Sequence, residues 1–508
     1  MATTLSPDRK WWKKAIVYQI WPKSFLDSTG SGIGDLNGIR SKLHYIKDLG
    51  VDVIWLSPIY ESPMKDEGYD ISNYEAINPD FGAMADFEGL IREAHQLGLK
   101  VVMDLVVNHT SDQHAWFRDS RAGGDKRDWY IWRPPHPETG REPNNWGAIF
   151  GGSCWEWDAG REAYYLHVFD ISQPDLNWEN PEVRNAVWDV MNFWIGKGCD
   201  GFRMDVINCI SKEPGFPDVP VTDQASEFQY GLLHRFNGQT CFHGRKWRLT
   251  ELKAILDDFM TYAQANDGWD SLYLENHDQP RIVSRWANDD RYRVQAAKML
   301  ALFHISGRGT VFVYQGQEIG MANSQQWTFE QLRDLEEINH YNAVKASRPG
   351  GDDMSDVLSD IQRIGRDNAR MPVSWDATEH AGFTAGTPWI KVNEDYREWN
   401  VSAQEGKEDS VLEFWRRLIQ LRKQELAFTY GAFEPVDSAS KEVYAYVRST
   451  EKVVLTVVCS FKDSKVSWRI PHEPGELVLS NYEPLAESGN DLDLVLQPFE
   501  CRLYRKVE

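Results

Sequence analysis

Apolar residues fall in short runs that alternate with stretches of helical periodicity in the first part of the chain. The runs at 15–20, 51–56 and 100–107 have the length and composition of buried strands. Between them, apolar positions recur at helical spacing over 36–49 and 84–97, which predicts helices with one buried face. Strands and helices in this order predict a parallel sheet with right-handed crossovers, in a closed barrel or a doubly wound sheet.

The alternation stops between 110 and 174, where the chain is rich in Trp, Gly, Pro and Asp and has no helical periodicity. A structureless loop of this length is uncommon in a compact domain, so we interpret the stretch as a small inserted domain. Alternation resumes with a predicted helix over 183–197 and a strand that ends at Asp205. Later elements of the same kind are strands at 271–274 and 310–314 and a helix over 411–424.

Beyond the last predicted helix, polar and apolar residues alternate in short strands separated by turns. This pattern is typical of a small antiparallel β-sandwich, with strands at 443–447, 453–458, 477–479, 492–496 and 502–504. The predicted division is the first part of a barrel, an inserted domain, the second part of the barrel and a C-terminal β-sandwich, at 1–109, 110–174, 175–428 and 429–508.

Composition narrows the possible partners and the compartment. The chain has 508 residues, 42% of them hydrophobic, and a net charge of -22, which argues against nucleic acid or an anionic membrane as a partner. No segment has the pattern of a signal peptide or a transmembrane helix, and the six cysteines are scattered without metal-type spacing. We therefore expect a cytoplasmic monomer with free thiols. The 22 Trp and 20 Tyr suit a ligand with flat C–H faces, such as a sugar, although packing alone accounts for most of them.

Polar residues gather where predicted strands end, at 104–109, 203–205 and 275–278. Active sites of parallel barrels lie at these carboxyl ends. Arg203 and Asp205 are two residues apart on one strand, so their side chains lie on the same face. The cation keeps the carboxylate ionised, as a nucleophile toward a sugar carbon must be.

These motifs resemble glycoside hydrolase family 13, the α-amylase superfamily, from about Lys10 to the C-terminus. The resemblance is closest to the oligo-1,6-glucosidase and α-glucosidase (maltase, isomaltase) branch, because of Gly-Tyr-Asp-Ile-Ser-Asn-Tyr at 68–74, Gln-Pro-Asp-Leu-Asn at 173–177 and Gly-Arg-Asp-Asn-Ala-Arg at 365–370. It implies an α/β fold, a TIM-type (β/α)8 barrel with an inserted domain after strand 3 and a C-terminal antiparallel β-sandwich. It also implies a retaining exo-acting α-glucosidase that cleaves terminal α-1,4- or α-1,6-linked glucose from maltose, isomaltose and short oligosaccharides, and that requires no cofactor.

By this resemblance Asp205 is the nucleophile, and Asp278 holds the 2- and 3-hydroxyls of the sugar. Asp70 and Arg366 would grip the 4-hydroxyl and close the pocket, so that only chain ends fit. The side chains that would orient Asp205 and bind hydroxyls are Arg203, His109 and His277, and those that would shape the pocket entrance are Phe169, Gln173 and Arg370. For Phe169 and Gln173, a packing role is an equally open alternative.

A loop near the N-terminus resembles the calcium site of the family in a degraded form. The family alternates oxygen ligands as Asp-x-Asn-x-Asp, and the corresponding positions here are Asp27, Thr29, Ser31, the Ile33 carbonyl and Asp35. Two strong oxygen ligands have become hydroxyls, and calcium affinity follows ligand charge. The alternatives are a weak structural Ca²⁺ site and an ordinary Gly-rich turn without a metal.

The general acid of the family, a Glu at the end of strand 5, is not found. Only 72 positions separate Asp205 from His277, whereas three βα units of a ~250-residue barrel need about 90. None of the glutamates in this interval ends an apolar strand in the right order, namely Glu213, Glu227, Glu251 and Glu275. The family resemblance lapses between Gly238 and Arg245, which predicts an internal loss of roughly sixty residues that covers the strand 5 to strand 6 region.

Two other functions stay open at this point. A transglucosylase or sucrose isomerase would use the same ester intermediate with a sugar as acceptor. A sugar-binding protein without catalysis is favoured by the absent acid. Val206, which follows the nucleophile, favours α-1,6 links as much as α-1,4 links, because branch members that prefer α-1,6 links often carry Val there.

Overall fold

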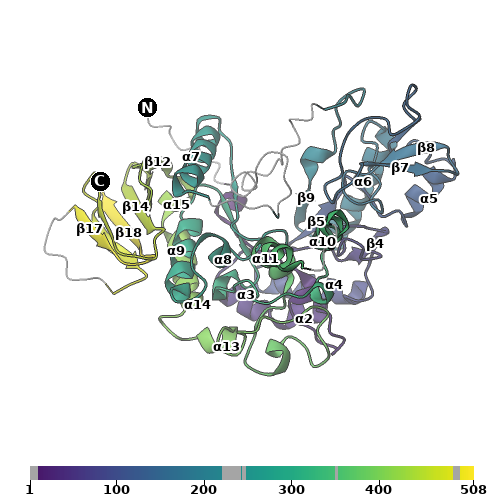
Figure 1. Ribbon diagram of the computed structural model, residues 1–508. Helices are drawn as coiled ribbons and strands as arrows, with labels where there is room; N and C mark the ends of the chain where they lie inside the picture. The colour runs from purple at the N-terminus through teal and green to yellow at the C-terminus, as the bar shows by residue number, and fades with distance from the viewer. Residues whose placement is uncertain (1–9, 220–241, 243–246, 349, 351–352, 484–491) are drawn as a thin grey trace.

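A six-stranded parallel sheet forms the centre of the protein in a computed structural model that describes residues 10–219, 242, 247–348, 350, 353–483 and 492–508 (Figure 1). Its strands lie in the order β10-β11-β1-β2-β5-β9, and every neighbouring pair is parallel. The strands are β1 (Ile16–Ile20), β2 (Val53–Leu56), β5 (Lys100–Val106), β9 (Gly201–Asp205), β10 (Ser271–Leu272) and β11 (Thr310–Tyr314). The predicted parallel α/β sheet is confirmed.

Helices cover the outer face of this sheet. They are α2 (Leu36–Ser41), α3 (Leu43–Leu49), α4 (Met84–Gln96), α6 (Pro181–Gly196), α7 (Leu249–Ala265), α9 (Arg293–Ile305) and α14 (Val411–Gln424). The single helix predicted over 36–49 is two helices, because Lys42 leaves the helical region with φ -106° and ψ 8°. Shorter elements complete the barrel region: α1 (Trp11–Lys14), β3 (Tyr60–Glu61), β4 (Asn73–Ile77), α8 (Ile282–Trp286), α10 (Leu335–Ser347), α11 (Ser355–Ile364), α12 (Asp367–Arg370) and α13 (Val401–Gln404).

The sheet is open at both edges within the described ranges. A TIM barrel closes with eight parallel strands, whereas β9 pairs here with β5 alone and β10 with β11 alone. All residues of β1 and β2 are buried, but Gly201 to Met204 of β9 are partly exposed. The open edges fall where strands 5 and 6 of a closed barrel would lie. Glu227 and the stretch from Gly238 to Arg245, apart from Phe242, are outside the described residues, so the predicted internal loss stays a prediction.

The stretch at 110–174 contains the three-stranded sheet β6-β8-β7, built from β6 (Trp132–Arg133), β7 (Trp155–Asp158) and β8 (Ala163–Leu166). The prediction that this stretch has no helix was wrong, because α5 (Ala115–Arg121) lies in it. The ring of His114 accepts a hydrogen bond from the Trp116 amide at the start of α5, and Phe117 packs under the sheet. A helix of this length is too short to give a clear periodicity.

The C-terminal region is a five-stranded antiparallel sheet faced by a two-stranded one. The larger sheet has the order β12-β13-β14-β18-β16, with β12 (Ala432–Val436), β13 (Val443–Ser449), β14 (Val453–Ser460), β16 (Glu476–Ser480) and β18 (Cys501–Val507). The smaller pairs β15 (Val466–Arg469) with β17 (Asp493–Leu496), and β12 and β15 were not predicted. Two buried arginines connect this region to the barrel. Arg422 donates hydrogen bonds to a carbonyl at the C-terminal end of α9 and to one in the short helix α15 (Leu426–Tyr430). Arg448 of β13 donates to the carbonyls that directly follow α9 and α15.

No helix in the described part of the chain is long and apolar enough to cross a membrane. Cys154, Cys199, Cys459 and Cys501 are buried free thiols. Cys241 lies outside the described residues. The cytoplasmic location stays a prediction.

We expect the open edges to show in amide exchange. Peptides that cover β9 and β10 should exchange at least about tenfold faster than peptides from β1 and β2, because an unpaired strand edge leaves alternate amides open to water. Hydrogen–deuterium exchange with mass spectrometry measures this directly. Equal protection of all four strands would mean that the two edges are paired.

Candidate functional site

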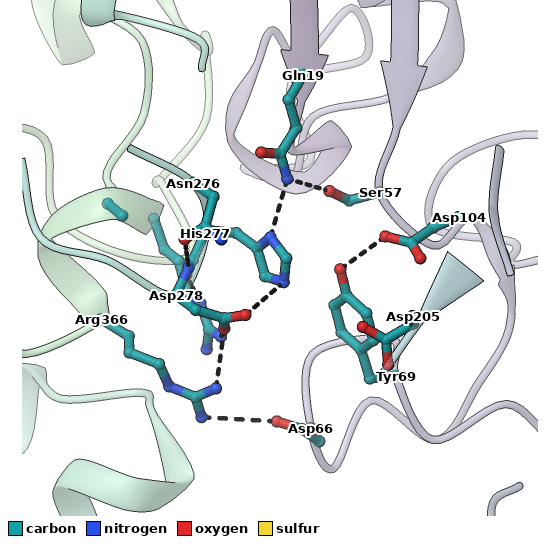
Figure 2. A network of polar contacts seen from close by, with 12 residues as sticks. Gln19, Ser57, Asp66, Tyr69, Asp104, Asp205, Asn276, His277, Asp278 and Arg366 are labelled. Atoms are coloured by element: carbon teal, nitrogen blue, oxygen red, sulfur yellow. Dashed lines mark hydrogen bonds and ion pairs between the residues drawn. The ribbon is translucent and has the colours of Figure 1, made fainter. Parts of the chain in front are cut away.

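The carboxyl ends of the strands open into a cavity of about 750 Å³. Its outer part is polar and is lined by Asp66, Tyr69, His109, Arg203, Asp205, His277, Asp278 and Arg366. Its deeper part is lined by apolar side chains from the inner face of the sheet, Val17, Val53, Val102 and Phe312. Figure 2 shows the polar part, with the side chains of Asp66, Tyr69, Asp205, His277, Asp278 and Arg366.

Asp205, the last residue of β9, forms an ion pair with Arg203 of the same strand. The Arg203 guanidinium also lies 3.0 Å from Asp104 on the neighbouring strand β5. Burial opposes the charge on Arg203, but Asp104 and Asp205 outweigh it and hold the pKa of Arg203 well above its ordinary value. Asp205 therefore faces a permanent positive charge, as its predicted role requires.

Asp104 and Tyr69 support this pair and were not singled out from the sequence. The Tyr69 hydroxyl donates to Asp104 Oδ2 at 2.9 Å. Burial of Asp104 next to Asp205 raises the pKa of the Asp104 carboxyl, although Arg203 counteracts this. A sequence signal for both residues was present, since Asp104 begins the polar strand end at 104–109 and Tyr69 stands inside the motif at 68–74.

Asp278 follows β10 and is held by three cationic or donor groups. Its carboxylate lies 3.0 Å from His277 Nε2, 3.0 Å from Arg366 Nη1 and 3.4 Å from Arg370 Nη2. Burial opposes ionisation, but His277, Arg366 and Arg370 outweigh it and lower the pKa of Asp278 well below its ordinary value. The side chain is 37% exposed, so it presents an ionised carboxylate to the cavity.

His277 is oriented by hydrogen bonding and by stacking. Gln19 Nε2 lies 2.9 Å from His277 Nδ1 and 3.2 Å from Ser57 Oγ (Figure 2). If Gln19 donates to Nδ1, the other ring nitrogen carries the proton that Asp278 accepts. The ring stacks on Tyr69 and Trp21 at centroid distances of 5.0 and 5.2 Å. His277 thus bridges β1 and the segment after β10.

The predicted pairing of Asp70 with Arg366 is corrected. Asp70 is fully buried and accepts hydrogen bonds from Ser62 Oγ and from the amides of Lys65 and Asp66, so it closes its own turn. Asp66 is the carboxylate that lines the cavity, 3.7 Å from Arg366. Both carboxylates belong to one turn, and their spacing does not tell which of them faces inward.

Asp66 has an unusual ionisation. Burial raises its pKa to about 8, and Arg366 and Arg370 only partly counteract this. Asp334 competes with Asp66 for the two arginines, because Arg366 lies 2.6 Å and Arg370 2.8 Å from the Asp334 carboxylate. Asp334, which no sequence pattern marked, thus takes the closer contacts of both arginines and fixes them beside Asp278.

Gln173 and Arg370 do not shape the entrance, in contrast to the prediction. Both are almost completely buried and neither lines the cavity. Gln173 Nε2 donates to Asp66 Oδ2 at 3.0 Å and lies 3.2 Å from His109 Nε2, so it supports the wall from behind. Phe169 does line the cavity, with its ring 5.0 Å from that of His109. Burial lowers the pKa of His109, which favours the neutral ring.

No glutamate of the interval before His277 reaches the cavity among the described residues. Glu213 is exposed in a turn, Glu251 bonds the amide of Arg248 at the start of α7, and Glu275 forms a buried ion pair with Arg281 at 3.0 Å. Glu336 of α10 does line the cavity, 3.9 Å from Arg366. Glu336 and Asp66 are therefore the described carboxyl groups to test as proton donors.

The loop that resembles a calcium site is held by its own hydrogen bonds. Asp27 accepts from the amides of Thr29, Gly30 and Gly32 and from Thr384 Oγ1. Asp35 accepts from Ser28 and from the Gly38 amide, while Ser31 donates to the Ile33 carbonyl. Within the ranges described, no group of three or more His, Cys, Asp or Glu could hold a metal ion. Calcium binding at this loop stays a prediction.

The chain is similar to a family model and to known proteins over most of its length. A family profile described as alpha amylase, catalytic domain, matches residues 19–237 and 227–431. The oligo-1,6-glucosidase of Parageobacillus thermoglucosidasius is 42% identical over 564 aligned positions, which cover 98% of this chain and 99% of that protein. A solved structure of an isomaltulose synthase mutant from Erwinia rhapontici NX5 with sucrose has a TM-score of 0.93 and 34% identity, over 98% of this chain and 100% of that one. Trehalose-6-phosphate hydrolase of Bacillus licheniformis has a TM-score of 0.91 and 38% identity, over 97% and 99%.

The alignment with the oligo-1,6-glucosidase is longer than the chain. Because 98% of 508 residues is about 498, about 66 of the 564 aligned positions hold no residue of this chain. The family profile also matches in two pieces that overlap at 227–237. These numbers do not place the unmatched positions in one stretch, and the predicted internal loss stays a prediction.

We expect Asp70→Asn to lower stability and Asp66→Asn to weaken glucose binding. Asp70→Asn should lower the unfolding free energy by about 1–3 kcal/mol, because an amide group would face the Lys65 amide and leave it unsatisfied. Asp66→Asn should change stability by less than about 1 kcal/mol at pH 7, since Asp66 is largely protonated there, but should weaken glucose binding. Urea unfolding and glucose titration measure the two effects. A stable Asp70→Asn protein with reduced glucose affinity would restore the original assignment.

Proposed function

The chain belongs to the α-amylase family of glycoside hydrolases, and we propose that it is an exo-acting α-glucosidase that retains the anomeric configuration. It would release glucose from the non-reducing end of maltose, isomaltose and short oligosaccharides. The observation that carries the proposal is the Arg203–Asp205 ion pair at the end of β9, which shares one cavity with the ionised Asp278.

In this mechanism Asp205 attacks the anomeric carbon and forms a glucosyl ester, which water then hydrolyses. Asp278 binds hydroxyls of the same ring and stabilises the positive charge that develops on it in the transition state. Arg366 contacts both Asp278 and Asp66, and Arg366 and Asp66 would hold the hydroxyl that marks the end of the sugar chain.

The departing sugar oxygen needs a proton, and the described residues supply no evident donor for it. A general acid of a retaining enzyme lies about 5 Å from the nucleophile, and its pKa is raised. Asp278 is strongly acidified, and the described glutamates before His277 lie outside the cavity. The described residues therefore provide the nucleophile of the proposed reaction but no evident proton donor for its leaving group.

A sugar acceptor in place of water is the second candidate. The reason to keep it is the likeness to the isomaltulose synthase structure, which contains sucrose. Both reactions share the ester, so only the acceptor distinguishes them. Hydrolysis in isotopically labelled water places the label on glucose, whereas transfer to a sugar leaves glucose unlabelled.

We expect a strong dependence on the leaving group. The chain should hydrolyse α-glucosyl fluoride, whose leaving group needs no proton, but should cleave maltose and isomaltose about 10²–10⁴-fold more slowly than an acid-competent enzyme. Asp205→Asn should abolish turnover of the fluoride while the circular dichroism spectrum stays unchanged. Rates of fluoride and glucose release measure both expectations.

Asp66→Asn and Glu336→Gln are the matched controls for proton donation. Loss of disaccharide cleavage with normal fluoride turnover in either variant would identify that residue as the acid, and the same result in Glu227→Gln would identify Glu227. Normal fluoride turnover by Asp205→Asn would contradict the nucleophile assignment. Glucose binding without any fluoride turnover would favour the sugar-binding protein.

Val206 generates an expectation about linkage. It lines the cavity directly after Asp205 and has φ 37°, a left-handed backbone that β-branched residues rarely adopt. We propose that its side chain leaves room for α-1,6-linked sugars. Isomaltose should inhibit fluoride hydrolysis at least as strongly as maltose, within about threefold. Inhibition constants for maltose, isomaltose, sucrose and trehalose test this, and tenfold tighter binding of maltose would contradict it.

A further inference from the structure

Three buried carboxyl groups lie behind Arg366 and Arg370. Asp334 directly precedes α10, Glu337 is the buried residue of α10, and Asp367 belongs to α12. None of these three carboxyl groups lines the cavity, and the mechanism proposed above does not use Glu337 or Asp367. Acidic side chains are rarely buried completely unless a partner compensates their charge. Three of them in one place therefore require a physical explanation.

Backbone amides connect the three carboxyl groups into a closed ring. Asp334 Oδ1 accepts from the Glu337 amide at 3.1 Å, and Glu337 Oε1 accepts from the Asp367 amide at 2.9 Å. Asp367 Oδ2 closes the ring, because it accepts from the Asp334 amide at 3.2 Å. It also accepts from the Arg333 amide at 2.7 Å. Each carboxyl group thus fixes the backbone of the next one.

Two oxygens of this ring have no hydrogen-bond donor in the described part of the chain. They are Glu337 Oε2 and Asp367 Oδ1, and both are buried. Asp334 Oδ2, by contrast, contacts both Arg366 and Arg370. A buried carboxylate oxygen without a donor is strongly disfavoured. Two such oxygens on residues that already contact one another satisfy each other if one of them carries a proton.

The charges around the ring give an independent argument for a proton. Asp334 and Asp278 already balance the two positive charges of Arg366 and Arg370. An ionised Asp367 adds one negative charge, and an ionised Glu337 would add a second one away from water, which is strongly disfavoured. Other titratable groups on the surrounding elements are Arg333, Glu336, His340 and Asp66.

The same balance appears in the ionisation of Glu337. Burial, with Asp367 and Asp334 close by, raises the pKa of Glu337 well above its ordinary value of 4.5. The Asp367 amide and Arg366 only partly counteract this. Asp367 is the better anion of the two, because two backbone amides donate to its Oδ2 and favour the charged form.

We infer that Glu337 carries a proton on Oε2 and donates it in a hydrogen bond to Asp367 Oδ1, and that Glu337 is thereby a positioning residue for Arg366 and Arg370. Asp367 directly follows Arg366 in the chain, and Asp334 contacts both guanidinium groups. A second negative charge behind the arginines would compete with Asp278 for them. The inference rests on the proposed function only where glucose binding is the measurement.

Infrared spectroscopy of the full chain tests the proton directly. A protonated carboxyl group has a carbonyl band that a carboxylate lacks. Glu337→Gln should remove one such band at neutral pH. Asp66→Asn should remove a different one, since the pKa of Asp66 is about 8. Glu451→Gln, at an exposed position between β13 and β14, should remove none. A Glu337→Gln spectrum that keeps every band of the wild type overturns the proposal.

The pH dependence of unfolding is the second measurement. A carboxyl group whose pKa is raised in the folded chain loses its proton on unfolding above pH 4.5, so its contribution to stability falls as pH rises. The unfolding constant of the wild type, divided by that of Glu337→Gln, should therefore rise about tenfold per pH unit between about pH 5 and about pH 7. Urea unfolding of both proteins gives this ratio. The proposal fails if the ratio is as flat as the one expected for Glu451→Gln.

Glucose binding separates a positioning role from a purely structural one. In Glu337→Gln, the amide group can accept from the Asp367 amide and donate to Asp367 Oδ1, so glucose affinity should stay within about twofold of the wild type. Glu337→Met fills similar space without either hydrogen bond. It should weaken glucose binding about tenfold with an unchanged circular dichroism spectrum, because the ring no longer fixes the arginines.

The outcomes of these experiments are distinguishable. Equal glucose affinities of the wild type and Glu337→Met would overturn the positioning role. Absence of glucose binding in every form, the wild type included, would contradict the proposed function instead. The infrared bands and the unfolding ratio would still decide whether Glu337 holds the proton, since neither measurement needs a ligand.

Discussion

Pairing along both edges of every strand is what keeps the interior of a parallel barrel away from water, and among the described residues β9 and β10 each pair along one edge alone. Strands β1 and β2, which pair on both sides, are fully buried, whereas β9 is mostly half-exposed. The same opening accounts for the deep apolar cavity, because side chains of the inner face that would form packed layers line open space. One pairing that is absent among the described residues thus underlies both observations.

Arginines pair with the carboxylates of the site. Arg203 contacts Asp205, while Arg366 and Arg370 contact Asp278, lower its pKa and are themselves held by Asp334. Glycoside cleavage needs two carboxyl groups with opposite tendencies, one charged and one protonated. Among the described carboxyl groups that line the cavity, Asp66 has a pKa raised to about 8, yet it lies at the Arg366 side, where a hydroxyl-binding role fits better. The described part of the site therefore has several arginines that stabilise carboxylate anions, but few carboxyl groups that could donate a proton.

The sequence predicted the parts of the fold that depend on local periodicity and strand-end chemistry. Five of the six sheet strands and three of the four predicted helices matched their patterns closely, whereas helices such as α9 and α10 were not predicted. Asp205, Asp278, Arg203 and His277 line one cavity as expected. The strand at 271–274 is only Ser271–Leu272, because the edge that would extend it has no partner. Asp70 was assigned in place of Asp66 because the two lie in one turn, and which of them faces the cavity depends on the backbone amides that Asp70 captures. Asp334 and Gln19 had no pattern, since their roles arise only when distant segments meet.

The two carboxylates on which the chemistry depends stand on the two open edges. Asp205 ends β9, and Asp278 follows β10, so the ladder that connects them runs the long way through β5, β2, β1 and β11. Among the described residues, a series of side-chain contacts also connects them: His277 stacks on Tyr69, which donates a hydrogen bond to Asp104, which in turn contacts Arg203. In a closed barrel, two intervening strands would fix their separation through backbone hydrogen bonds as well. A shift of about 1 Å between catalytic groups is enough to lower a rate substantially. Closure of the barrel would therefore affect catalysis in two ways. It would add a general acid, and it would fix the distance between Asp205 and Asp278.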